Sequence, residues 1–158
     1  MISLNKASAT FLGLVIIGIC ISSYLVYYHY ASRAGAKGWC NINDQINCKN
    51  VIQSRYSEIF GVPLAAFGLV WFSVSGIFHY FRESSVAFLG PNAPFYLFVW
   101  SSIGVVSVIV LVFLEIFSVG SICLLCTACH IMAVGIFAIS HTFLKKPLSD
   151  YVRDLFYY

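Results

Sequence analysis

The stretch SICLLCTACHIMAVGIFAISHTF, residues 121–143, has no Asp, Glu, Lys or Arg, and a CxxC pair, Cys123 and Cys126, lies near its start. A helix needs about 20 apolar residues to cross the hydrocarbon core of a bilayer, so this stretch is long enough to be a span. Three similar stretches precede it, and we expect spans at about 9–29, 62–81, 94–115 and 121–143. The sequence therefore predicts an all-α integral membrane protein, a bundle of four transmembrane helices.

The composition of the whole chain agrees with a lipid environment. Of 158 residues, 60% are hydrophobic and 9% are charged, whereas soluble domains carry about 25% charged residues. Such a chain cannot cover a water-exposed surface with polar groups, so we expect membrane lipid around it. The net charge of +3 is spread along the sequence, which argues against nucleic-acid binding. No internal repeat is visible, and we expect one membrane domain over residues 1–158.

One polar segment, residues 31–61, is long enough to form a sizeable loop between the first two spans. It contains Cys40 and Cys48, and disulfides persist on the oxidising side of a membrane. We therefore expect the loop to be extracytoplasmic and, since the number of spans is even, both termini to be cytoplasmic. The distribution of Lys and Arg adds only a weak signal. We also expect a short surface helix within residues 51–60 and an aromatic belt at residues 27–30, Tyr-Tyr-His-Tyr.

The CxxC pair is a candidate redox site. Cys123 and Cys126 are expected in the first turn of the fourth span, where an i, i+3 spacing puts them on one face. The partial positive charge of a helix N-terminus favours a thiolate, which is the reactive form of cysteine. The alternative is that both residues are small apolar side chains packed between helices.

The loop cysteines form a second candidate pair. Seven residues separate Cys40 from Cys48, and the turn-forming run 41–44, Asn-Ile-Asn-Asp, lies between them. The pair is either a structural disulfide or an exposed dithiol that passes electrons to the CxxC, and the spacing does not distinguish these roles. Two dithiol pairs in a chain this hydrophobic indicate a membrane protein that moves electrons through disulfides.

Together these features resemble the vitamin K epoxide reductase family, and most of all its prokaryotic members. The resemblance covers nearly the whole chain, from the first span to the fourth. The residues that carry it are Cys40 and Cys48, then Ser54, then Gly61-x-Pro63 at the start of the second span, and Cys123-x-x-Cys126.

The resemblance implies a membrane thiol:quinone oxidoreductase that forms disulfide bonds. Cys123 and Cys126 match the active-site pair, with Cys126 expected to react with a quinone, either ubiquinone or menaquinone. Cys40 and Cys48 match the loop shuttle pair, with Cys48 expected to exchange with Cys123. Ser54 matches a serine that family members place near the quinone. Because the chain ends soon after the fourth span, its redox partner is expected to be a separate thioredoxin-fold protein, and the prokaryotic likeness places it in the cell membrane.

Two positions depart from the vertebrate pattern. His130 stands where vertebrate members have a tyrosine, and it is expected either to hydrogen-bond a quinone carbonyl or to pack between helices. Leu64, Ala65 and Ala66 occupy the region where those members carry an asparagine. Both departures favour plain quinone reduction over the alternative, reduction of vitamin K epoxide.

The remaining candidates carry weaker signals. Glu115 is an ionisable residue near the outer end of the third span, so it is either a quinone-site residue or a side chain that snorkels to the interface. Cys129 and Cys20 are expected to be structural. A different class of protein is also open: a non-catalytic membrane protein in which the four paired cysteines bind zinc. Its spacing is a poor match to known zinc motifs, and we expect no metal.

Overall fold

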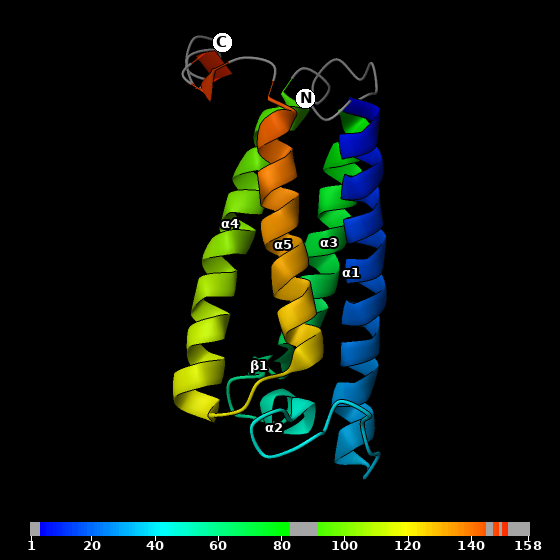
Figure 1. Ribbon diagram of the computed structural model, residues 1–158, viewed down its shortest axis with the longest axis vertical. Helices are drawn as coiled ribbons and strands as arrows, with labels where there is room; N and C mark the ends of the chain where they lie inside the picture. Colours follow the sequence, from blue (N-terminus) through cyan, green and yellow to red (C-terminus); the bar gives the residue numbers. More distant parts are fainter. Residues whose placement is uncertain (1–3, 83–91, 145–146, 149, 152–158) are drawn as a thin grey trace.

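The computed structural model describes residues 4–82, 92–144, 147–148 and 150–151. Four long helices run side by side, and α1 begins and α5 ends at the same end of the bundle (Figure 1). Residues 34–63 cover the opposite end, which we call the loop end. The elements in chain order are α1 (Leu4–Arg33), α2 (Cys48–Ile52), β1 (Glu58–Ile59), β2 (Val62–Pro63), α3 (Leu64–Phe81), α4 (Ala93–Phe113), the π-helix η1 (Leu114–Val119) and α5 (Leu124–Thr142).

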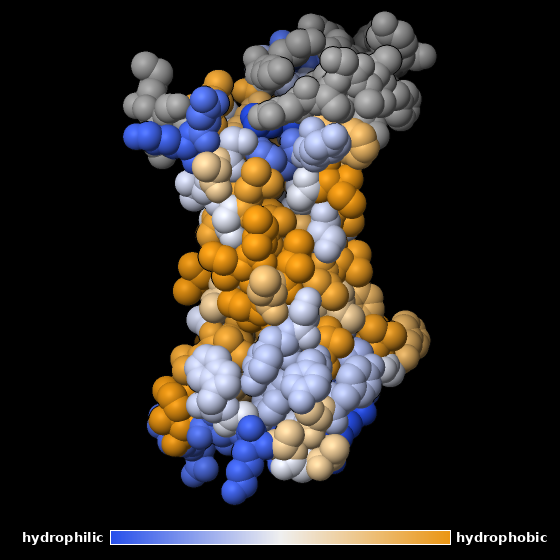
Figure 2. Space-filling model, turned by 90° about the vertical axis from the view of Figure 1, so that its right-hand side faces the viewer, coloured by the Kyte–Doolittle hydropathy of each residue, from blue (hydrophilic) through white to orange (hydrophobic). Residues whose placement is uncertain are grey.

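The four long helices are long and apolar enough to cross a membrane. This confirms the predicted all-α membrane bundle. On the face shown in Figure 2, hydrophobic residues cover the middle of the molecule and hydrophilic residues lie toward both ends. Large apolar side chains such as Ile16, Val106 and Ile131 point outward and are more than half exposed. Lipid tails solvate such side chains, so this surface needs no polar cover.

Helix packing relies on small residues at the contacts, as expected where lipid removes the hydrophobic drive between helices. Helix α1 packs against α3 and α5, and α4 packs against the same two helices. Gly18 of α1 lies directly against the ring of Phe72 in α3, where a Cβ would come within 2.5 Å of ring carbons. Ser101 and Ser140 share a buried hydrogen bond of 2.8 Å between α4 and α5.

Two helix boundaries at the loop end differ from the predicted ones. The third span continues beyond residue 115 as η1 and ends at Gly120, whose φ of 68° is the left-handed conformation that favours glycine. The fourth helix begins at Leu124, because Cys123 is extended (φ −97°, ψ 110°) and is the N-cap residue. The prediction that Cys123 lies in the first helical turn was therefore wrong by one position.

The loop itself also differs from expectation. Only residues 51 and 52 of the expected helix within 51–60 are helical, and they end α2. This helix begins at Cys48, because the Asn47 side chain accepts a hydrogen bond from the Asn50 N–H and caps it. The remainder of that segment turns into the two-stranded hairpin β1–β2. The aromatic belt is only partly present: Tyr27 is 67% exposed, whereas His29 is 1% exposed and belongs to the interior.

Candidate active site

The loop cysteines are joined in the structure. Cys40 and Cys48 form a disulfide with their Cα atoms 5.7 Å apart, and both residues are fully buried. Between them the chain folds back on itself, with Asn41 bridged to Asn47 in antiparallel fashion. The Asn43 carboxamide oxygen accepts hydrogen bonds from the backbone N–H groups of Gln45 and Ile46. These Asn contacts supply the turn that brings the two sulfurs together.

The folded loop is docked on the segment that precedes the CxxC. Ile46 pairs with Ile122 as an isolated parallel bridge. The Asn47 N–H donates to the Ile122 carbonyl at 3.1 Å, and the Ile122 N–H donates to the Gln45 carbonyl at 2.7 Å. The Ser121 hydroxyl adds a hydrogen bond of 2.8 Å to the Asp44 carbonyl. The chain entering Cys48 therefore runs beside the chain entering Cys123.

The Cys123 side chain caps a helix in addition to carrying a free thiol. Its sulfur accepts a hydrogen bond of 3.2 Å from the Cys126 N–H, so the sulfur caps the N-terminus of α5. The partial positive charge at this helix end therefore falls on the Cys123 sulfur. Cys123 is fully buried and Cys126 is half-buried, and both are free thiols.

The two cysteine pairs share one buried cluster at the loop end. Cys40, Cys48 and Cys123 are core members of this cluster, and Cys126 and Cys129 pack against it. The apolar side chains around the sulfurs include Leu25, Tyr28 and Ile52. The structure thus brings together all four cysteines singled out in the sequence. With Cys40 and Cys48 bonded to each other, a zinc site made of four thiolates cannot form in this state.

Glu115 lies beside the CxxC sulfurs. One of its carboxylate oxygens and the sulfurs of Cys123 and Cys126 all lie within 4.8 Å of one another. The side chain is buried, at 7% exposure, and its Oε1 has no hydrogen-bond partner among the described residues. Glu115 belongs to η1, and its carbonyl accepts from the Gly120 N–H at 2.9 Å, the i to i+5 bond of a π-helix.

His130 lies one turn beyond Cys126 on α5, and its Nδ1 is buried without a hydrogen-bond partner in the part of the chain that the structure describes. Residues four apart in a helix share a face, so the imidazole lies on the same face as the Cys126 thiol. Buried polar atoms are usually satisfied. The unpaired Nδ1 of His130 and the unpaired Oε1 of Glu115 are thus suited to the carbonyl and hydroxyl oxygens of a quinone or quinol head group.

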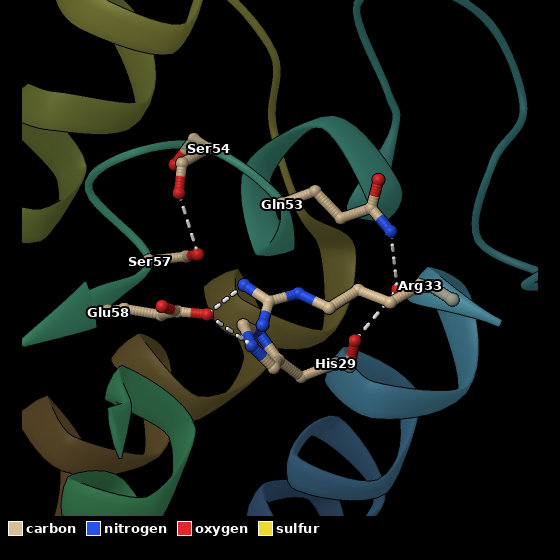
Figure 3. Close-up of polar contacts among 7 residues, drawn as sticks. His29, Arg33, Gln53, Ser54, Ser57 and Glu58 are labelled. Carbon is tan, nitrogen blue, oxygen red and sulfur yellow. Dashed lines mark hydrogen bonds and ion pairs between the residues drawn. The ribbon is translucent and has the colours of Figure 1, made fainter. Parts of the chain in front are cut away.

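Ser54 lies in a different set of contacts (Figure 3). Its carbonyl accepts a hydrogen bond of 2.8 Å from the Ser57 hydroxyl. None of the contacts found in the described residues joins the Ser54 side chain to a cysteine. The structure places it beside a polar network that sequence reasoning missed, in which Glu58 binds both His29, at 2.7 Å, and Arg33.

This network ties the second half of the loop to the end of α1. Gln53 extends it by donating to the Ser32 hydroxyl at 3.0 Å. His29 is buried and Arg33 is largely exposed, so the ion pair spans the boundary between interior and solvent. A histidine in an apolar span followed by an acidic residue in the next loop is the one signal that pointed to this pairing, and the aromatic residues around His29 obscured it.

Four membrane-spanning helices with a disulfide docked beside a CxxC pair define a class, the membrane thiol–disulfide oxidoreductases. The profile of the vitamin K epoxide reductase family matches residues 9–141, most of the chain. The protein therefore belongs to the vitamin K epoxide reductase family, whose members use quinones in general. A search of curated proteins found no match.

Proposed function

We propose that this protein is a thiol:quinone oxidoreductase that oxidises a thioredoxin-fold partner and passes the electrons through its two cysteine pairs. The observation that carries the proposal is the docking of the Cys40–Cys48 hairpin on the strand that leads into Cys123. A purely structural disulfide needs no such neighbour. An exchange relay needs it, because a thiolate must reach the sulfur that it attacks.

Electrons enter at the loop pair. Cys40 is fully buried in the docked loop rather than exposed as expected, so the loop must open before the partner can reach it. A partner thiolate then attacks the Cys40 sulfur, the Cys40–Cys48 bond breaks, and Cys48 leaves as a thiolate. The partner's second thiol then displaces Cys40, so the partner departs as a disulfide and Cys40 remains as a thiol. The position of Cys48 supports this order, since Cys48 starts α2 directly after the docked Asn47.

The second exchange takes place inside the cluster. The Cys48 thiolate attacks Cys123 of an oxidised Cys123–Cys126 pair, which forms a Cys48–Cys123 disulfide and releases Cys126. Attack by Cys40 on Cys48 then restores the loop disulfide and leaves Cys123 and Cys126 as two thiols, the state seen in the structure. Two electrons and two protons have moved from the partner to the CxxC pair.

The acceptor is held by this chain's own polar groups. The His130 ring would donate a hydrogen bond from its buried Nδ1 to a quinone carbonyl, and the Glu115 Oε1 would accept one from a quinol hydroxyl. A bound quinone supplies an acceptor for two electrons and two protons from the dithiol. Ser54 stays a proposed contact to the quinone, since its half-buried side chain lies in the loop that covers this end.

The cysteine end of the bundle is proposed to be extracytoplasmic, with both termini in the cytoplasm, and the membrane to be the cell membrane. The cysteine chemistry supports this side, because disulfide exchange with exported proteins takes place in an oxidising compartment. Labelling of Lys37 in intact cells with a membrane-impermeant amine reagent tests it, and protection of Lys37 in cells that label after lysis would contradict it.

The deciding experiment is anaerobic mixing of the reduced, purified protein with a short-tail quinone, followed by quinone absorbance. We expect rapid two-electron reduction by wild type and by Cys129→Ala, a thiol of the same helix outside the pair, and none by Cys126→Ala. Cys40→Ala should keep quinone reduction and lose only oxidation of the partner. Full turnover in Cys126→Ala, or none in wild type with its thiols confirmed free, would refute the mechanism.

A further inference from the structure

Three side chains at the loop end converge in the manner of a metal site. The ligand atoms are a carboxylate oxygen of Glu115 and the sulfurs of Cys123 and Cys126, all within 4.8 Å of one another. Independently, the Glu115 side chain is more than nine-tenths buried, and its Oε1 lacks a hydrogen-bond partner among the described residues. A buried carboxylate oxygen without a partner is costly, which makes it a mark of binding sites.

We propose that Glu115, Cys123 and Cys126 bind a thiophilic divalent cation such as zinc whenever the CxxC pair is reduced. The inference adds regulation to the proposed function and rests on it only in that the pair cycles between dithiol and disulfide. The metal site and the quinone reaction use the same two sulfurs but bind different ligands, a cation and a quinone, so either proposal can fail without the other.

The donor set fits such an ion. Zinc prefers thiolate sulfur, and it accepts carboxylate oxygen, in a tetrahedral arrangement with three protein ligands and one open position. Bond lengths of about 2.3 Å to sulfur and about 2.0–2.2 Å to oxygen put neighbouring ligand atoms about 3.5–3.8 Å apart. Because the three atoms already lie within 4.8 Å of one another, side-chain rotations that move them by about 1 Å would complete the tetrahedral geometry.

Charge also favours binding. Two thiolates and a carboxylate together carry three negative charges, which would be costly in a buried site unless a cation neutralised them. Binding therefore releases the two thiol protons to water, as metal binding by cysteines does in general. The Cys126 N–H that donates to the Cys123 sulfur would hold that ligand in place.

The consequence is a site gated by redox state. A bound cation occupies both sulfurs, so neither can exchange with Cys48 or pass electrons onward. Oxidation of Cys123 and Cys126 to a disulfide removes both thiolates and with them two of the three ligands. Cation binding and electron transfer are thus mutually exclusive at this dithiol.

The test is an anaerobic titration of the fully reduced full-length protein in detergent with Cd²⁺, following the ultraviolet absorbance of thiolate–cadmium bonds. Competition with a fluorescent zinc indicator then gives the affinity for zinc. Cys40 and Cys48 are reduced as well in every sample, so the Glu115→Gln variant, which keeps all four thiols, distinguishes the proposed site from a site made of four thiolates. We expect wild type and the control Cys129→Ser to bind one equivalent that Cys123→Ser lacks.

Glu115→Gln keeps the shape of the side chain and removes its charge. We expect it to weaken zinc by at least the roughly 10–100-fold that changes outside the ligand shell cost, with circular dichroism confirming its fold. Equal affinity in Glu115→Gln would overturn the assignment of the carboxylate. Should that variant misfold, wild type carrying the Cys123–Cys126 disulfide must lose the same equivalent, and its retention would overturn the site.

The two proposals separate cleanly in wild type. Quinone reduction without cation binding defeats the metal site and leaves the proposed function intact. Cation binding without quinone reduction refutes the proposed function and leaves the metal site intact.

Discussion

Replacing Ser121 by alanine should loosen the loop from the CxxC without altering either cysteine pair. The Ser121 hydroxyl donates to the Asp44 carbonyl at 2.8 Å and accepts from the Asn50 side chain at 3.3 Å. The residue is 4% exposed, so water does not readily replace these bonds. At about 1 kcal/mol each, losing both costs about 2 kcal/mol, which lowers the docking equilibrium constant about thirtyfold.

Hydrogen exchange measures that equilibrium directly. The Asn47 N–H, which donates to the Ile122 carbonyl, is protected only while the loop is docked, so its exchange should accelerate about thirtyfold in Ser121→Ala. Ser107→Ala is the matched control, because the Ser107 hydroxyl bonds to the Ile103 carbonyl within its own helix. Unchanged Asn47 exchange in Ser121→Ala would refute the claim that these contacts hold the loop in place.

Three further predictions concern packing, the loop network and the quinone. Gly104→Ala would bring a methyl group into steric conflict with the ring of Trp71 and should lower the free energy of unfolding by about 1–3 kcal/mol in thermal melts. Gly13→Ala, with open space around it, should leave that free energy unchanged, and equal effects of the two substitutions would contradict the packing. Glu58→Ala removes the partner of a buried imidazole and should cost about 2–3 kcal/mol in the same melts; a change below about 0.5 kcal/mol would show the network to be dispensable. His130→Phe should raise the KM for quinone while thiol exchange between the pairs is kept, and an unaltered KM would place His130 outside the quinone site.

The bundle was predictable because lipid allows few solutions. A stretch without charges such as 121–143 must be a helix if it crosses hydrocarbon, since every backbone polar group has to be satisfied internally. The four spans follow from that rule alone. The loop was less predictable, because short polar side chains decide its path. The capping of α2 by Asn47 and the turn at Asn43 are choices among many that an Asn-rich segment permits.

The candidate site divides in the same way. The two cysteine pairs could be read from spacing, and the structure brings them into one cluster. The proximity of Glu115 to those sulfurs could not be predicted from the sequence, because it depends on the π-helix. A regular α-helix would rotate the carboxylate by a different angle, and no residue type signals the extra residue in the turn. The pairing of His29 with Glu58 was hidden because it joins two segments whose relative position only the fold defines.

The docking contacts also bear on how the protein is made. The Cys40–Cys48 hairpin is local and can close as soon as the first loop has left the ribosome. The docking contacts of the hairpin form later, because Ser121 lies 77 residues after Asp44 and belongs to the segment that precedes α5. Synthesis proceeds from the N-terminus at about 5–20 residues per second, so about 4–15 seconds separate the two events. During biogenesis the loop is therefore an unattached redox hairpin, and insertion of the final helix is the step that connects it to the CxxC.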